Sequence, residues 1–231
     1  MSVQADIQKF ANKEKAVLLS RYFKTGKGQY GEGAVFLGLT VPQQRAIAQK
    51  YKDLPLREIE LLLKQNIHEY RLTALLILVK QFEKGSDEER KQIVNLYLHN
   101  TKYINNWDLV DLSAPKIVGT YLLHQKPKRK LLYTFAKSKN LWERRIAIMS
   151  TFPFIKQKDF SDTFAIAEDL LHDKHDLIHK TVGWCLREIG KVDQKKEEEF
   201  LKKHAKMMPR TMLRYAIEKF PIVQRARYLH K

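Results

Sequence analysis

The segment KTVGWCLRE, residues 180–188, places a glycine at position 183 inside an apolar stretch with helical spacing. Other small residues, or a valine, lie inside similar stretches at Ala74, Val110, Ala147 and Ala216. The five positions are separated by 36, 37, 36 and 33 residues. A period in the mid-thirties is typical of a repeat built from one helix pair, in which small residues let neighbouring helices approach closely. The sequence therefore predicts an all-α fold, an α-solenoid of helix pairs with a concave surface long enough for an extended polymer.

A glycine-rich stretch interrupts the helical pattern near the N-terminus. Five of the nine glycines lie between Gly26 and Gly38, which indicates a loop, and Pro42 then suits the first turn of a helix. Residues 26–31 formally match the dinucleotide pattern GxGxxG, but the preceding residues 16–23 have the pattern of a helix and not of a strand. We therefore expect a flexible or DNA-apposed loop here. No break separates two domains, so residues 1–231 are predicted to form one helical repeat domain.

Composition excludes several classes of protein. A chain of 231 residues that is 44% hydrophobic can bury a sizeable core and is not intrinsically disordered. Its longest apolar run, residues 74–79, is far shorter than the roughly 20 residues that a membrane helix needs. Asp6 and Lys9 lie where a signal peptide would be apolar, so we expect a protein of a reducing compartment without a membrane partner. The single cysteine, Cys185, excludes an internal disulfide and a cysteine-based zinc site, and we expect it in the core.

The net charge of +17 favours a nucleic-acid partner, with an acidic membrane surface or an acidic protein as alternatives. Two basic clusters contribute much of this charge. The first comprises Lys126, Lys128, Arg129, Lys130, Lys137, Lys139, Arg144 and Arg145. The second comprises Lys202, Lys203, Lys206, Arg210, Arg214, Lys219, Arg225, Arg227 and Lys231. Together they favour contact with phosphates over an ordinary solvated surface.

The segment NNWDLVD, residues 105–111, is the strongest candidate site. Trp107 and Asp111 are four residues apart and share one helical face. In the repeat register Trp184 is equivalent to Asp111, and Arg145 lies near the same face one repeat later. Two tryptophans, a carboxylate and an arginine could thus converge on the concave surface. The alternative is that both tryptophans are core residues and that Asp111 is a helix cap or a salt-bridge partner.

A metal site is not expected. His175 and His179 have the i, i+4 spacing of metal ligands and His172 lies nearby, but the segment reads as an exposed turn followed by a helix start. We expect neither a metal nor a cofactor.

Four segments together resemble the AlkD-type DNA alkylation repair glycosylases, a family of HEAT-like α-solenoids. They are residues 36–42 (FLGLTVP), 106–111 (NWDLVD), 141–147 (LWERRIA) and 180–188 (KTVGWCLRE), and the similarity runs over nearly the whole chain in the order of the family. Two features depart from the pattern: Val41 stands where some members have a hydroxyl residue that can touch DNA, and the glycine-rich loop is longer than in some members.

The resemblance implies specific roles. Trp107, Asp111, Arg145 and Trp184 would form the catalytic cleft. The DNA contacts that we expect are Arg144, Arg187, Lys180, Lys128, Arg129, Arg210, Arg214 and Thr40.

The implied activity is hydrolysis of the N-glycosidic bond of N3- or N7-alkylated purines, without strand cleavage and without a cofactor. The partner would be double-stranded DNA that contains alkylated purines, bound by a monomer in the bacterial cytoplasm or nucleoid. One alternative is a non-catalytic member that binds DNA structures, and another is a scaffold that binds an acidic protein.

Overall fold

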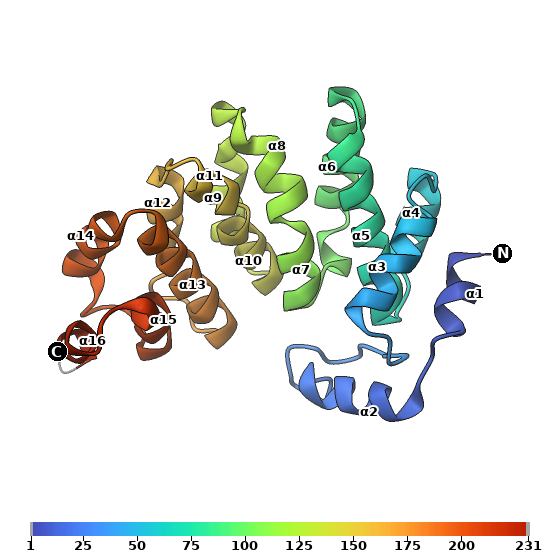
Figure 1. Ribbon diagram of the computed structural model, residues 1–231, viewed down its shortest axis with the longest axis horizontal. Coiled ribbons are helices and arrows are strands. Elements are labelled where there is room, and N and C mark those ends of the chain that lie inside the picture. The colour runs from blue at the N-terminus through green and yellow to red at the C-terminus, as the bar shows by residue number, and fades with distance from the viewer. Residues whose placement is uncertain (1, 230–231) are drawn as a thin grey trace. The chain divides into compact units, whose positions relative to one another are not determined.

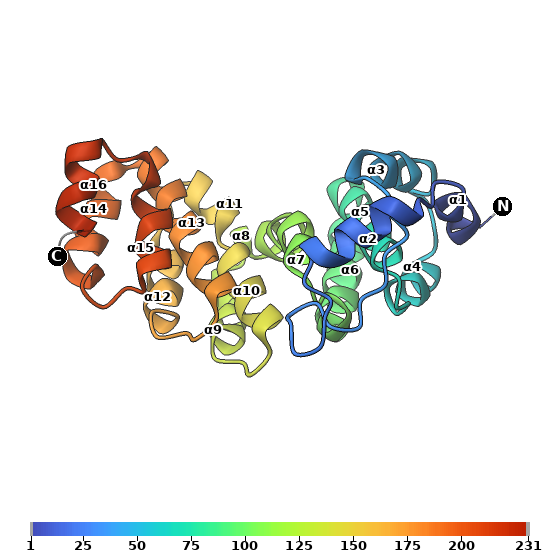
Figure 2. The ribbon, with the colours of Figure 1, turned by 90° about the horizontal axis from the view of Figure 1, so that it is seen from below.

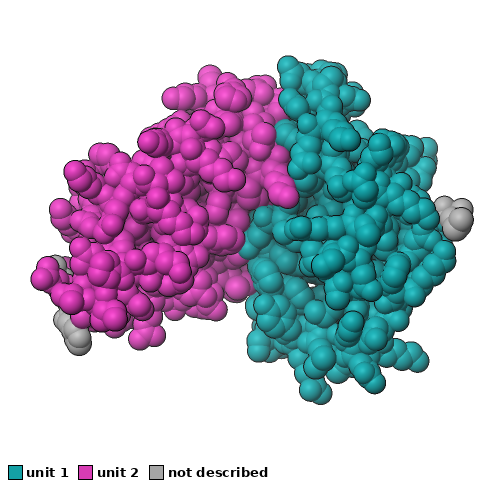
Figure 3. All heavy atoms as spheres, viewed as in Figure 1, with its two compact units in different colours: residues 1–113 teal, residues 114–231 magenta. Residues whose placement is uncertain are grey.

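The computed structural model describes residues 2–229 and is all-helical in that range. Among residues 2–229 the one β-type contact is an isolated bridge between Val35 and Ile67. The predicted all-α fold is therefore confirmed. The chain divides into two compact units, unit 1 with residues 1–113 and unit 2 with residues 114–231 (Figure 3), and each is described here by itself. A single domain over residues 1–231 stays a prediction.

Unit 1 is a set of paired helices joined by short turns and one long loop (Figure 1). Its helices are α1 (Val3–Gln8), α2 (Lys13–Tyr22), α3 (Val41–Lys50), α4 (Leu56–Leu63), α5 (His68–Lys84), α6 (Asp87–His99) and α7 (Trp107–Ser113), with a 3-10 turn at Thr101–Tyr103.

Helix α5 is the centre of unit 1, because apolar residues lie on all sides of it and most of its residues are buried. It packs against α3, α4, α6 and α7, and Ala74 in its middle is fully buried. Helix α3 begins as the sequence predicts: Thr40 and Gln43 form a reciprocal capping box, and Pro42 lies in the first turn. The packing of α7 against α5 fixes α7 on one side of that helix.

The loop between α2 and α3 is tied to α5 by one buried carboxylate. Glu69 accepts hydrogen bonds from the backbone N–H groups of Leu37 (3.0 Å), Gly38 (2.7 Å) and Leu39 (3.2 Å). Gly38 has φ +93°, and a Cβ there would overlap the carbonyl oxygen of Asn12, so only glycine fits. Helix α2 precedes this loop, and the strand that a dinucleotide site requires is not found in the described residues.

Unit 2 is also helical. Its helices are α8 (Thr120–Leu123), α9 (Lys130–Ala136), α10 (Leu141–Met149), α11 (Phe152–Lys156), α12 (Ser161–Asp169), α13 (Asp176–Val192), α14 (Gln194–His204), α15 (Arg210–Ala216) and α16 (Ile222–Leu229). A π-helical turn lies at Pro115–Gly119, and 3-10 turns lie at Lys126–Arg129 and Ile217–Lys219.

The repeat positions of unit 2 lie where successive helices touch. Helix α10 packs on α13 and α13 packs on α15, and these three helices carry Ala147, Gly183 and Ala216, all buried. A Cβ at Gly183 would overlap the carbonyl oxygen of Met212 on α15. The expected close helix contact is thus confirmed at Gly183. Cys185 is buried as expected, and no helix among residues 2–229 has the length and apolar character to cross a bilayer.

The charged run Lys195–Glu199 contains one buried acid. The run forms part of α14, and Glu197 within it is only 1% exposed. Its carboxylate lies on the backbone of Gly190 in α13, a position where any side chain would collide with it. The charge run is therefore a solvated face interrupted by one buried acid.

Candidate functional site

Trp107 and Asp111 occupy one face of α7, as their spacing predicts. Asn106 immediately precedes the helix, and its carbonyl accepts the N–H of Val110 at 3.2 Å. Both Trp107 and Asp111 are half-buried, so each presents part of its side chain at the surface of unit 1. Neither the indole nor the carboxylate is sequestered in the core.

An aromatic cluster, formed by Tyr22, Phe23, Phe36, His68 and Trp107, supports the indole. The Trp107 ring stacks on Phe23 with centroids 5.2 Å apart and an interplanar angle of 16°, and it meets Tyr22 edge-on at 6.0 Å. Phe23 stacks on Phe36 at 5.0 Å, and Phe36 stacks on His68 at 4.5 Å. One face of Trp107 is therefore backed by a column of rings contributed by α2, the following loop and α5.

Sequence reasoning did not find the other members of this cluster. Tyr22 and Phe23 end α2 and Phe36 follows the glycine-rich loop, so these aromatic residues flank the loop and lie far from Trp107 along the chain. That flanking pattern is the one signal in the sequence from which these residues could have been found. Tyr22 is 63% exposed and forms the outer edge of the cluster.

The charge of Asp111 acts on Tyr97, a buried residue of α6. Burial raises the pKa of Tyr97 far above its ordinary value, and the negative charge of Asp111 acts in the same direction. The Tyr97 hydroxyl lies 2.9 Å from Ser113 Oγ, which opposes that rise. The site in unit 1 thus combines a supported indole with a carboxylate one helical turn away.

Arg145 and Trp184 belong to unit 2. Arg145 on α10 is 5% exposed, and its Nη1 donates to the carbonyl of Leu177 at 2.8 Å, in the first turn of α13. Thr181 Oγ1 donates to the same carbonyl at 2.7 Å. Arg145 therefore ties α10 to the helix that carries Trp184. The convergence of Arg145 and Trp184 with the pair in unit 1 stays a prediction.

Trp184 lies half-buried in the middle of α13. Its Nε1 donates to Glu188 Oε1 at 3.0 Å, and its ring meets Phe152 edge-on at 4.9 Å. Lys180 lies one turn before Trp184 and Arg187 nearly one turn after it, so this face of α13 is both aromatic and charged.

Residues 3–220 match the family model of the DNA alkylation repair enzymes. The chain belongs to the DNA alkylation repair enzyme family. A solved structure described as a "predicted DNA alkylation repair enzyme" from Enterococcus faecalis has the same fold, with a TM-score of 0.73 and 21% sequence identity over 92% of this chain and 97% of that one. No curated protein matches the chain.

Membership in a DNA alkylation repair family implies DNA as the partner, which makes the accessibility of each basic residue important. Lys128, Arg210, Arg214 and Thr40 are exposed. Lys128 lies over the ring of Tyr121, and Arg210 donates to the carbonyl of Leu229 at 2.8 Å. Thr40 is the N-cap of α3. Phosphate contact by these four residues stays a prediction, and Lys231 of the second basic cluster lies outside the described residues.

Arg129 does not have the surface position that its basic neighbours suggested. Its guanidinium is 4% exposed and donates to Asp159 at 2.8 Å and to Asp162 at 2.6 Å. It also lies 3.9 Å from the ring centroid of Phe154. Because a buried guanidinium needs acidic partners, Arg129 is held inside unit 2 and is left out of the DNA contacts proposed below.

Three other expected DNA contacts carry acidic partners. Arg144 Nε donates to Asp173 at 2.6 Å, Lys180 Nζ lies 2.7 Å from Asp176, and Arg187 pairs with Glu218. The pairs of Lys180 and Arg187 involve carboxylates that are about half exposed, so phosphate could replace them. Asp173, by contrast, is 5% exposed, and Arg144 also donates to the carbonyls at 138 and 139, so it closes a turn.

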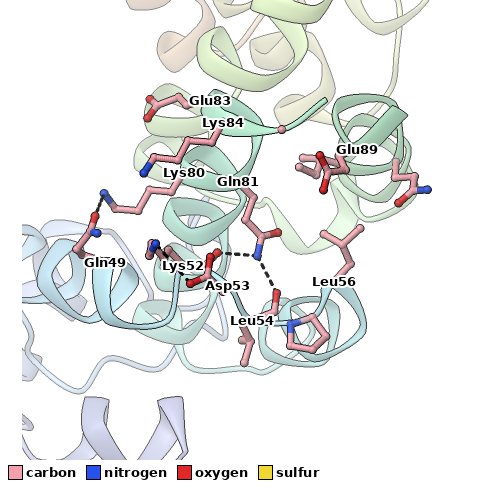
Figure 4. A pocket seen from close by; sticks show the side chains of 14 residues that line it. Gln49, Lys52, Asp53, Leu54, Leu56, Lys80, Gln81, Glu83, Lys84 and Glu89 are labelled. Atoms are coloured by element: carbon pink, nitrogen blue, oxygen red, sulfur yellow. Dashed lines mark hydrogen bonds and ion pairs between the residues drawn. The ribbon is translucent and has the colours of Figure 1, made fainter. Parts of the chain in front are cut away.

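A cavity of about 460 Å³ in unit 1 is not the candidate site. It lies between the α3–α4 turn and the junction of α5 with α6, and none of the predicted site residues lines it (Figure 4). Lysines 52, 80 and 84 are balanced by Asp53, Glu83 and Glu89. Gln81 donates to the carbonyls of Lys52 and Leu54, so its amide serves to join α5 to the turn.

The histidine segment has a local structural role. His175 caps α13 by accepting from the N–H of Leu177 at 3.2 Å, and His179 Nε2 lies 2.5 Å from the carbonyl of Asp173. Within residues 2–229, no group of three potential ligands could hold a metal ion.

Proposed function

We propose that the protein is a monofunctional DNA glycosylase that hydrolyses the N-glycosidic bond of N3- or N7-alkylated purines in duplex DNA. The observation that carries this proposal is the pair on α7, a half-exposed indole backed by stacked rings and a half-exposed carboxylate one turn away. Family membership supports a role in alkylation repair.

The chemistry suits these two side chains. Alkylation at N3 or N7 makes a purine cationic and turns it into a good leaving group, so little acid catalysis is needed. The electron-rich face of Trp107 attracts the cationic nucleoside. As the glycosidic bond breaks, the sugar acquires oxocarbenium character, which the Asp111 carboxylate stabilises while it positions the attacking water.

The residues of unit 2 would hold the strand. In this proposal Trp184 contributes a second aromatic face, and Lys180 and Arg187 bind phosphates by exchanging their carboxylate partners. Arg145, which is buried and donates to the carbonyl of Leu177, holds the start of α13 in place and would reach a phosphate only through the small exposed part of its side chain. Release of the base leaves an abasic site in an unbroken strand.

The test is excision from methylated duplex DNA under single-turnover conditions. Wild-type protein should release methylated purines, and the strand should break only after alkali treatment. Asp111→Asn should keep its unfolding midpoint and most of its DNA affinity while excision falls by about 10²–10³-fold, because it loses a transition-state interaction. Asp53→Asn is the matched control, because Asp53 is an acid of the same unit whose side chain is 85% exposed.

The outcomes separate the proposal from its alternatives. DNA binding without base release by the wild-type protein would identify a non-catalytic member of the family. A stable, fully active Asp111→Asn variant would disprove the role of the carboxylate. The absence of any salt-sensitive DNA binding would favour the scaffold that binds an acidic protein.

A further inference from the structure

Helix α2 has an outward face that the proposed site does not use. None of its residues is buried, and Val17, Leu18 and Tyr22 are 52%, 63% and 63% exposed. Leu18 and Tyr22 are four residues apart and form one stripe along the helix. Figure 1 shows α2 at the lower edge of unit 1, and the view from below places it in front of that unit (Figure 2). Because these exposed apolar side chains adjoin one another on one helix, the stripe is a candidate interaction surface.

The helix is held firmly at both ends, so the exposure is not the result of fraying. At its start the Asn12 side chain accepts the N–H of Lys15 at 2.9 Å, and the Asn12 N–H donates to the carbonyl of Leu37 at 2.7 Å. At its end Phe23 is buried in the aromatic cluster, stacked on Trp107. The fold therefore presents the outer side of α2 as a fixed surface.

The charges around the stripe select a polyanion as its occupant. Lys13, Lys15 and Arg21 are exposed on α2, and Glu14 is the single acid of the helix. The stripe also leads directly to the candidate site, because Tyr22 touches Trp107 edge-on. Proteins that bind the DNA minor groove combine basic side chains with apolar ones in this way.

We infer that the Leu18–Tyr22 stripe is a groove-contact surface that packs against the deoxyribose rings of duplex DNA beside the nucleotide held at Trp107. The inference takes duplex DNA as the partner from the proposed function, and it does not depend on base excision. Leu18 supplies the apolar contact, and Lys15 and Arg21 supply the neighbouring phosphate contacts.

The experiment measures the affinity of the full chain for a fluorescent, lesion-free duplex as a function of salt. Leu18→Ala should weaken binding roughly five- to tenfold, as expected for partial burial of a leucine side chain, and should leave the slope of log affinity against log salt unchanged. Lys15→Gln should instead reduce that slope by about 0.9. Leu61→Ala on α4 is the matched control, since Leu61 is 54% exposed, and it should bind as the wild type does.

A conservative variant separates contact from folding. Leu18→Met keeps the apolar volume and should retain wild-type affinity, while all four variants should keep the wild-type melting temperature. Unchanged binding by Leu18→Ala, or an equal loss in Leu61→Ala, would overturn the inference while the proposed function stands. If the wild-type protein bound no duplex at all, the proposed function would fail first.

Discussion

His68 Nε2 lies 2.8 Å from Asp108 Oδ2, and both side chains are buried. Asp108 is the chain neighbour of Trp107, and the His68 ring closes the column of stacked rings that supports the indole. The pair therefore fixes Trp107 through the backbone of α7 and through the aromatic cluster at once.

Asp108→Ala should destabilise the protein by about 1–3 kcal/mol, because it leaves the buried His68 nitrogen without its partner. Asp108→Asn keeps a hydrogen-bonding group of the same size and should cost less. Urea unfolding followed by circular dichroism measures both. Asp53→Ala, a change to an exposed acid of the same unit, should stay within about 0.5 kcal/mol of the wild type. An Asp108→Ala variant as stable as the wild type would show that the pair contributes nothing.

The sequence predicted those features of the structure that depend on residues close together along the chain. The four-residue spacing of Trp107 and Asp111 predicted a shared helical face, and the repeat placed Gly183 at a helix contact, because helical periodicity and a 36-residue repeat both report packing within or between neighbouring elements. The structure confirms both.

Contacts between distant segments were outside the reach of this reasoning. His68 and Asp108 are 40 residues apart, and no local pattern states which apolar faces meet in space. For the same reason the basic run 126–130 could not reveal that Arg129 is the buried member, since its carboxylate partners follow some 30 residues later. Pairing of this kind is decided by tertiary packing.

Arg129 and Lys128 should behave as opposites although they are adjacent. Arg129→Ala removes the buried partner of two partly exposed carboxylates, Asp159 and Asp162, and should cost about 1–3 kcal/mol of unfolding free energy. Lys128→Ala should leave stability unchanged and reduce the salt slope of DNA binding by about 0.9. Paired unfolding and binding titrations check this. A stable Arg129→Ala protein that binds DNA less well would return Arg129 to the DNA contacts.

Gly183→Ala should destabilise the contact between α13 and α15 by about 1–3 kcal/mol, and Gly183→Leu by more. The added Cβ would overlap backbone and Cβ atoms at Met212 and Tyr215, and such atoms cannot move aside as the end of a flexible side chain can. Melting curves measure the effect. Lys27→Ala, at an exposed position of the glycine-rich loop, should keep the wild-type melting temperature. Equal melting temperatures for Gly183→Leu and the wild type would refute the proposed close contact.

Glu197 is a buried acid that should make stability depend on pH. Its carboxylate is pressed onto Gly190, and its Oε1 has no hydrogen-bond partner among the described residues. Burial raises the pKa of Glu197 from 4.5 to about 8, the negative charge of Glu198 adds to the rise, and the positive charge of Arg187 opposes it. The folded protein therefore holds a proton on this group at pH values where the unfolded chain has released it.

The pKa of Glu197 is higher in the folded protein than in the unfolded chain. Burying this group therefore lowers the free energy of unfolding least below about pH 4.5, and the loss grows as the pH rises to about 8. The side-chain amide of the Glu197→Gln variant does not titrate in this pH range. We therefore expect this variant to gain stability relative to the wild type progressively over that range, to a plateau on the order of a few kcal/mol above it. Urea unfolding at a series of pH values from about 5 to 9 measures the difference. Glu199→Gln, at an exposed position of the same helix, should show no such trend. A stability difference between Glu197→Gln and the wild type that stays constant with pH would mean that Glu197 is ionised in the folded protein, and its carboxylate would then have to be paired with Arg187.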